Sequence, residues 1–211
     1  MIDLKKYKQM NFNEEQLYQI EEGLEEGLDV SIFIKPEFDS SQMAQIRYGL
    51  EKNINLEVYA KPEYEWDQME QILEGLIEGT DISMYADKKF NGLQMQEIRK
   101  GLKAGFDIEV YADEKYDENQ MEQIRLGLEK GLDISTYTNY EYDFCQMLEI
   151  RLGLEEKLDV SIYNNIKYDA NQMREIRLGL ENNINISKYA SPEYDWWQMR
   201  EIRLELEENN N

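Results

Sequence analysis

The stretch Tyr168–Asn185 reads YDANQMREIRLGLENNIN, and 26 residues later the stretch Tyr194–Asn211 reads YDWWQMREIRLELEENNN. At this spacing the 211-residue chain contains eight copies in register, with no insertion or deletion between them. The copies begin at Tyr7, Phe33, Tyr59, Tyr85, Tyr111, Tyr137, Tyr163 and Tyr189. A fixed period of roughly 20 to 50 residues is typical of a solenoid or another repeat array. We therefore expect one repeat domain over residues 1–211, without a linker or a second domain.

A glutamine marks the start of a long helix in every copy. It occurs at Gln16, Gln42, Gln68, Gln94, Gln120, Gln146, Gln172 and Gln198. Three residues before it stands Asn or Asp in seven copies and Glu65 in the other, which is the pattern of a capping box. Met121, Ile124 and Leu128 then follow at the i, i+3 and i+7 positions of an amphipathic helix. The pattern predicts long helices over residues 14–25, 40–51, 66–77, 92–103, 118–129, 144–155, 170–181 and 196–207.

The end of each long helix is marked as well. Gly131 and Asn183 are examples of the residue types that a left-handed helix C-terminus favours, and Lys157 stands at the same position. Two residues later an Asp or Asn, such as Asp133, can cap a short helical segment such as ISTY. Pro36, Pro62 and Pro192 follow such segments. One copy is too small to bury its own apolar stripe, so the predicted fold is an all-α, elongated α-solenoid of stacked copies.

The middle of the long helix contains a glycine in the first seven copies. These residues are Gly23, Gly49, Gly75, Gly101, Gly127, Gly153 and Gly179. Because glycine costs about 1 kcal/mol relative to alanine inside a helix, we expect each one to admit the backbone or an aromatic side chain of the next copy. The eighth copy has Glu205 instead, and we interpret residues 205–211 as a polar C-terminal cap.

The composition is strongly acidic. The chain has 23 Lys and Arg against 45 Asp and Glu, which gives a formal net charge of −22. Its 41% of hydrophobic residues in a strict period indicates a folded protein and not a disordered acidic tail. The start, MIDLKKYKQMNFNEE, has no apolar signal region, and no apolar run is long enough to span a membrane. A lone Cys145 fits a reducing compartment, so we predict a cytoplasmic protein that contacts no membrane.

The residue types give little support to catalysis. The chain has no histidine, which removes Ser/His and Cys/His pairs together with the commonest metal ligand. It has no phosphate-binding glycine motif, and its nearest approach to a calcium loop, DKKFNG from Asp87, fails at the third position. Close carboxylate pairs are expected by chance in so acidic a chain. We therefore predict a protein that is not an enzyme and holds no metal or cofactor.

Two sets of recurring residues are interpreted as structural. An arginine, as in Arg125, lies four residues before Glu129, which predicts an ion pair within the helix or a ladder between copies. The aromatic residues that begin each copy, and those five residues later, are interpreted as core, with a base-stacking or ligand groove as the alternative. The positions of Trp66, Phe144, Trp196 and Trp197 hold small or polar residues in other copies. These four either pack over a neighbouring loop or form exposed anchors for a partner.

The acidity is uneven, and it suggests where a partner binds. The copies that begin at 7, 59, 111, 137 and 189 hold most of the negative charge, and the others are near neutral. Helices about 10 Å apart would give about one net charge per 3.6 Å, close to the roughly 3.4 Å between phosphates of one DNA strand. The candidate partner-binding residues are Glu65, Trp66, Asp67, Glu70, Glu74, Glu118, Glu122, Phe144, Trp196 and Trp197.

The repeat unit YASPEYDWWQMREIRLELE, together with GLEKGLDISTYT, resembles a family of tandem-repeat proteins from bacterial mobile elements and phages. The resemblance covers all eight copies, and the family has no established activity. It implies inhibition of a host nuclease or restriction system. We therefore expect a non-enzymatic acidic protein that blocks the basic nucleic-acid-binding site of a host nuclease or nucleic-acid-guided effector by mimicry. The alternatives are a protein scaffold that binds through exposed aromatics and a small-molecule sponge, and the acidity argues against direct binding to nucleic acid.

Overall fold

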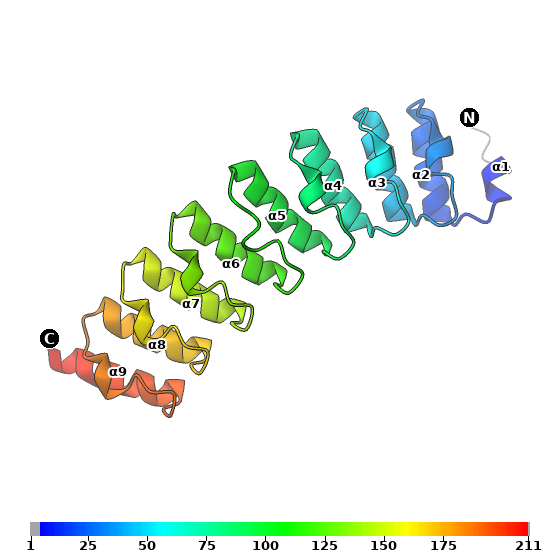
Figure 1. Ribbon diagram of the computed structural model, residues 1–211. Coiled ribbons are helices and arrows are strands. Elements are labelled where there is room, and N and C mark those ends of the chain that lie inside the picture. The colour runs from blue at the N-terminus through cyan, green and yellow to red at the C-terminus, as the bar shows by residue number, and fades with distance from the viewer. Residues whose placement is uncertain (1–4, 211) are drawn as a thin grey trace. The chain divides into compact units, whose positions relative to one another are not determined.

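The computed structural model describes residues 5–210, which contain helices and no strand (Figure 1). A short α1 (Lys5–Lys8) precedes the long helices α2 (Glu14–Glu25), α3 (Ser40–Glu51), α4 (Trp66–Glu78), α5 (Gly92–Ala104), α6 (Glu118–Glu129), α7 (Phe144–Glu155), α8 (Ala170–Glu181) and α9 (Trp196–Asn210). The long helices begin at the predicted residues, and α4, α5 and α9 extend one to three residues further than predicted. The all-α class is therefore confirmed for the residues that the structure describes.

Capping boxes set the helix starts. In α6 the N–H of Gln120 donates to Asp117 Oδ1 and the N–H of Asp117 donates to Gln120 Oε1, both at 2.8 Å. Equivalent pairs begin α2, α3, α5, α7, α8 and α9. The copy with Glu65 at this place differs in one contact, because the N–H of Gln68 donates at 2.9 Å to Asp67 Oδ1. The first-turn N–H groups thus find side-chain acceptors, as predicted.

The helix ends also follow the prediction. The residues that follow the long helices α2 to α8 are left-handed, as for Gly79 at φ +73° and Lys157 at φ +59°, and the others are Gly27, Asn53, Gly105, Gly131 and Asn183. Short 3-10 helices follow, each capped by the preceding Asp or Asn: η1 (Val30–Ile32), η2 (Leu56–Val58), η3 (Ile82–Met84), η4 (Ile134–Thr136), η5 (Val160–Ile162) and η6 (Ile186–Lys188). After α5 a turn over residues 109–111 replaces the predicted short helix, and nothing in the structure explains this difference.

Lys157 offers a test of the helix-end geometry. A left-handed residue other than glycine costs about 1–2 kcal/mol, so Lys157→Gly should raise the free energy of unfolding by about 1 kcal/mol. Lys157 and Lys130 are both exposed, but Lys130 has a right-handed φ of −85°. Lys130→Gly should therefore lower stability by about 0.5–1 kcal/mol. Urea unfolding of both variants checks this, and a loss of stability in both would contradict it.

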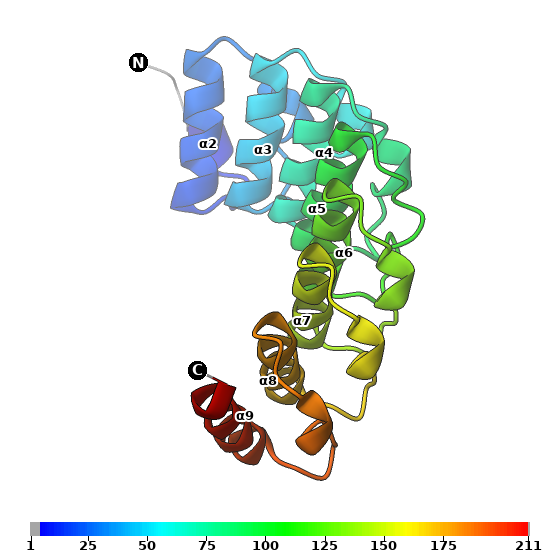
Figure 2. The same cartoon turned by 90° about the vertical axis from the view of Figure 1, so that its left-hand side faces the viewer.

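The described residues fall into two compact units, the first ending at Ile108 and the second beginning at Glu109. In the first unit α2 packs on α3, α3 on α4 and α4 on α5. In the second unit α6 packs on α7, α7 on α8 and α8 on α9, and each of η4, η5 and η6 packs on the long helix before it (Figure 2). A single domain over residues 1–211 stays a prediction.

Each unit has a core in which a tyrosine fits against a glycine of the preceding helix. A Cβ atom on Gly49 would lie 1.7 Å from Tyr59 Oη. The fully buried Tyr59 donates from this hydroxyl to Gln45 O at 3.2 Å, inside α3. The same arrangement joins Gly75 to Tyr85, Gly127 to Tyr137, Gly153 to Tyr163 and Gly179 to Tyr189. Glycine is therefore required where the next copy's tyrosine reaches the helix backbone, which confirms the prediction that an aromatic side chain approaches there.

The capping glutamine joins one copy to the next as well as starting the helix. While Gln146 Oε1 accepts from the N–H of Asp143 at 2.9 Å, its Nε2 donates to Tyr168 O at 2.6 Å. The same bond to a carbonyl 22 residues later is made by Gln16, Gln42, Gln68, Gln120 and Gln172. An amide supplies both an acceptor and a donor, whereas an ionised glutamate of the same shape supplies acceptors only. This double role explains why Gln, and not Glu, occupies the third position of these helices.

Candidate functional site

The aromatic residues at the helix starts are mostly exposed. The exposed fraction is 46% for Trp66, 40% for Phe144 and 56% for Trp197. Trp196 is half-buried and stacks on Trp197, with ring centroids 4.1 Å apart and an interplanar angle of 26°. The guanidinium of Arg200 lies 5.8 Å from the centre of the Trp197 ring. Each of the three exposed rings stands in the first turn of a long helix and keeps about half of its surface exposed to solvent.

The predicted acidic residues of α4 differ in their availability. Glu65 is exposed at the N-cap, beside the exposed Trp66. Asp67 accepts the N–H of Gln68, and Glu74 forms an ion pair with Arg99 of α5. Glu70 Oε2 accepts a hydrogen bond from Gln71 Nε2 at 3.3 Å. Asp67 and Glu74 therefore have structural roles, which the sequence analysis did not foresee.

The remaining candidate residues belong to the second unit and lie on three of its helices. Glu118 and Glu122 are half-buried on the first turns of α6, and Phe144 begins the adjacent α7. Trp196 and Trp197 begin α9, which α8 separates from α7. Within this unit the structure thus brings Glu118 and Glu122 near the start of α7, while the tryptophan pair lies two helices away.

Most of the arginines are largely buried. They form an arginine ladder, in which an arginine of one long helix bonds to its own helix or to the preceding one. Arg177 Nε donates to Glu149 Oε2 of the preceding helix at 2.7 Å, and its Nη1 pairs with Glu181 of the same helix. Arg47, Arg99, Arg125, Arg151 and Arg203 occupy the same position, and the six side chains are 9–18% exposed. The predicted helix ion pair and the predicted ladder both occur. Burial lowers the pKa of Arg177, but hydrogen bonding and the charges of Glu149 and Glu181 raise it overall.

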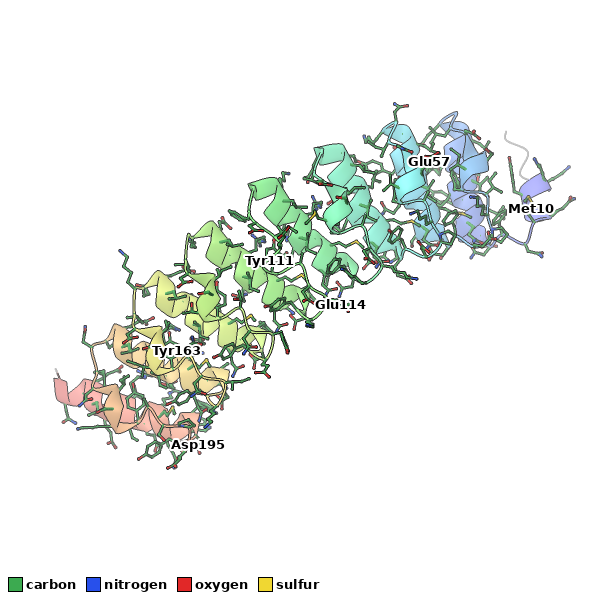
Figure 3. The ribbon with its side chains drawn as sticks, in the orientation of Figure 1. Met10, Glu57, Tyr111, Glu114, Tyr163 and Asp195 are labelled. Carbon is green, nitrogen blue, oxygen red and sulfur yellow. The ribbon has the colours of Figure 1, made fainter. Side chains whose placement is uncertain are left out.

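The tyrosines that begin each copy offer no binding groove. From Tyr59 to Tyr189 these rings are buried, and burial raises the pKa of Tyr163, whose hydroxyl donates to Glu149 O. Tyr163 lies among the helices of the second unit, whereas Asp195 is exposed (Figure 3). The interpretation of this set as core is confirmed, and the alternative of a base-stacking groove is wrong for these rings.

The described residues contain no other recognisable chemical centre. Between residues 5 and 210 no group of three or more His, Cys, Asp or Glu side chains could hold a metal ion. Burial, with the charges of Asp143 and Glu149, raises the pKa of the Cys145 thiol, so this group is not an activated thiolate. In the same part of the chain no helix has the length and apolar character to cross a membrane.

Sequence reasoning missed a row of partly exposed leucines on the long helices of the second unit. Leucine occupies one outward position of these helices, and it occurs at Leu126, Leu152, Leu178 and Leu204. The equivalent residues of the first unit are Glu22, Tyr48, Glu74 and Lys100. A comparison of the copies position by position would have revealed this difference.

Comparison of the chain with protein-family models, with curated proteins and with solved structures finds no match to any of them. Function is therefore inferred from the residues and their contacts.

Proposed function

We propose that the protein is a non-enzymatic, cytoplasmic binding protein built as an α-solenoid of eight 26-residue repeats. Its acidic surface occupies the basic nucleic-acid-binding site of another protein, such as a host defence nuclease or a nucleic-acid-guided effector, by nucleic-acid mimicry. The observation that carries this proposal is the arginine ladder. Six of the eight arginines are largely buried: five donate to a side chain of the preceding copy, and Arg125 pairs with Glu129 of its own helix. The exposed charge is therefore dominated by carboxylates.

The spacing of exposed carboxylates supports mimicry. In the second unit the helix-capping residues Asp117, Asp143, Asp169 and Asp195 are all exposed and occupy equivalent positions on adjacent helices. Packed helices lie about 10 Å apart, which is about three phosphate spacings of one DNA strand. These carboxylates are fixed by their hydrogen bonds to the capping glutamines. A basic groove that normally binds the phosphates of a nucleic acid can bind such a rigid, regular row of negative charge in their place.

The test uses one exposed loop position that carries either sign of charge. It holds Glu37, Glu63, Glu141 and Glu193 in four copies, and Lys89, Lys115 and Lys167 in three others. Changing the four glutamates to lysine should weaken binding at least about tenfold at low salt, and changing the three lysines to glutamate should strengthen it. Affinity should fall steeply between about 50 and about 500 mM NaCl, and duplex DNA should compete.

The wild-type chain is first used to capture proteins from a bacterial lysate, and the captured proteins are purified. Titration calorimetry then measures their affinities for the wild-type chain and for each variant. Binding that neither salt nor DNA changes would refute the mimicry proposal. The opposite charge changes at one loop position form matched controls, because none of these residues lies in the core.

A second candidate function, a protein scaffold, is favoured by the exposure of Trp66, Phe144 and Trp197. Aromatic side chains dominate many protein interfaces. A scaffold would lose binding when these three residues are changed to alanine and would show little dependence on salt, whereas a charge mimic would keep most of its affinity. A small-molecule sponge is not proposed, because the tyrosine rings that begin the copies from Tyr59 to Tyr189 are buried.

A further inference from the structure

The outward face of the second unit differs from the rest of this acidic protein. On α9, Trp197, Arg200 and Leu204 lie at i, i+3 and i+7 and therefore share one helix face. Met199 of the same helix is fully buried, and Leu204 is 41% exposed. The equivalent Leu178 on α8 is half-buried. The solvent side of these helices is thus partly apolar, although the chain as a whole has 45 acidic residues.

Leucines form a continuous row across this face. Leu126, Leu152, Leu178 and Leu204 occupy equivalent positions on α6, α7, α8 and α9, and each helix packs on the next. Leu148, which is half-buried, lies one turn before Leu152 on the same side of α7. Charged residues occupy this position in three copies of the first unit, so packing does not require leucine there. The row is therefore a surface feature and not part of the core.

Two arginines beside the row have no carboxylate partner. Arg174 and Arg200 are exposed on α8 and α9, one turn before Leu178 and Leu204. The other four arginines of this unit all form ion pairs, within their own helix or with the preceding one. Within residues 5–210 neither Arg174 nor Arg200 has a carboxylate at ion-pair distance. The guanidinium of Arg200 lies over the ring of Trp197. In so acidic a chain, two unpaired arginines next to the half-buried Leu178 and the exposed Leu204 point to an acidic ligand with an apolar side.

We infer that this face binds an acidic amphipathic helix of a partner protein, lying across α6, α7, α8 and α9. Adjacent leucines of the row are about 10 Å apart, which matches seven residues of an α-helix. The partner helix therefore has apolar residues in a heptad pattern over about 20 residues. Arg174 and Arg200 have the same spacing, so they would pair with two carboxylates seven residues apart. This inference goes beyond the proposed mimicry, because the partner is acidic and not basic. On α6 the position of Arg174 and Arg200 is occupied by Glu122, so the two arginines place the acidic side of the partner over α8 and α9.

The probe is a fluorescein-labelled peptide of about three heptads with leucine at positions a and d and glutamate at positions e and g, which also keeps it monomeric by repulsion. A second peptide has lysine in place of glutamate. Fluorescence anisotropy should show the acidic peptide binding at least about tenfold more tightly than the basic one. Binding of neither peptide, or equal binding of both, would overturn the inference.

The variants use residues that the chain itself tolerates at these positions. Leu152→Glu with Leu178→Glu copies the first unit's Glu22 and Glu74, and it should reduce affinity for the acidic peptide at least about tenfold. The matched control is Tyr48→Glu, the same position in the first unit, which should leave affinity unchanged. Circular dichroism checks that each variant is folded. Unchanged affinity in the double leucine variant would overturn the inference.

A charge exchange tests the arginines separately. Arg174→Glu with Arg200→Glu should lose the preference for the acidic peptide and bind the basic peptide more tightly than the wild-type protein does. Sedimentation without peptide should show that the wild-type protein and the leucine variant have the same mass. If the wild-type protein dimerises and Leu152→Glu with Leu178→Glu abolishes the dimer, the occupant is a second copy of the chain and the inference is wrong.

Discussion

Replacing Gly127 by alanine should lower the free energy of unfolding by about 2–3 kcal/mol, although alanine normally stabilises a helix interior by about 1 kcal/mol relative to glycine. The added Cβ atom would lie 1.8 Å from Tyr137 Oη and 2.9 Å from Ile134 Cγ2. The tyrosine must therefore move, which breaks its hydrogen bond to Gln123 O. Overpacking costs about 1–3 kcal/mol, and a buried group left without its partner costs about as much. Urea unfolding followed by circular dichroism measures the change.

A double-mutant cycle separates the hydroxyl from other effects. Tyr137→Phe alone should cost about 1 kcal/mol, but it should reduce the effect of Gly127→Ala by at least about 1 kcal/mol. The first unit already contains a glycine that faces a phenylalanine at this place. A Cβ atom added to Gly23 would lie 3.1 Å from Phe33 Cζ. Glu205→Ala changes an exposed residue at the same position of α9, and it should change stability by less than about 0.5 kcal/mol. Equal effects of Gly127→Ala and Glu205→Ala would contradict the explanation of the glycines.

Changing Gln146 to glutamate should destabilise the protein by about 3 kcal/mol at neutral pH. The shape is nearly unchanged, and one carboxylate oxygen can still accept from the N–H of Asp143. The other oxygen would face Tyr168 O, which now accepts from Gln146 Nε2 at 2.6 Å. Two acceptors would then meet at a buried position, one of them charged. Urea unfolding at neutral pH measures the loss.

The pH dependence of this variant has a definite sign. The buried position disfavours the ionised form of the introduced glutamate, so its pKa is higher in the folded state than in the unfolded state. The loss should be complete above the folded-state pKa and should shrink as the pH falls through it toward about 4, because a protonated carboxyl can donate to Tyr168 O.

Gln198→Glu is the matched control. Gln198 makes the same capping contacts with Asp195, but it is exposed, and within the described part of the chain its Nε2 donates to no carbonyl. This variant should change stability by less than about 0.5 kcal/mol. If Gln198→Glu loses as much stability as Gln146→Glu, the capping contacts and not the bond to Tyr168 O would account for the effect.

The helices were predictable because their signals are local. Asp117 and Gln120 are three residues apart, and their reciprocal bonds need nothing outside one helical turn. The bonds of Gln120 Nε2 to Tyr142 O and of Tyr137 Oη to Gln123 O were not predictable, because they depend on how the next copy packs. The sequence contains the residue types, but only the packed structure determines which distant carbonyl each side chain reaches.

The candidate surfaces were predictable only in part, for a related reason. Trp196 and Trp197 are neighbours in the sequence and both depart from the repeat pattern, yet only Trp197 is exposed. Glu74 resembles a free surface carboxylate until the ion pair with Arg99 of the next helix is known. A departure from the repeat therefore shows that packing tolerates different residues at that position. It does not show whether the side chain is accessible to a partner.

The bonds between copies have a constant sequence separation, and this has a consequence for how such a chain changes in evolution. The separation is 22 residues for glutamine Nε2, 14 for tyrosine Oη and 28 for arginine Nε. A gain or loss of one whole 26-residue segment within a unit leaves every side chain opposite an equivalent acceptor, whereas inserting one residue misaligns all three kinds of bond. Recombination between the similar gene segments can therefore lengthen or shorten the protein in whole copies. Because the copies differ in charge and in exposed aromatic residues, one such event adds or removes a whole set of these side chains.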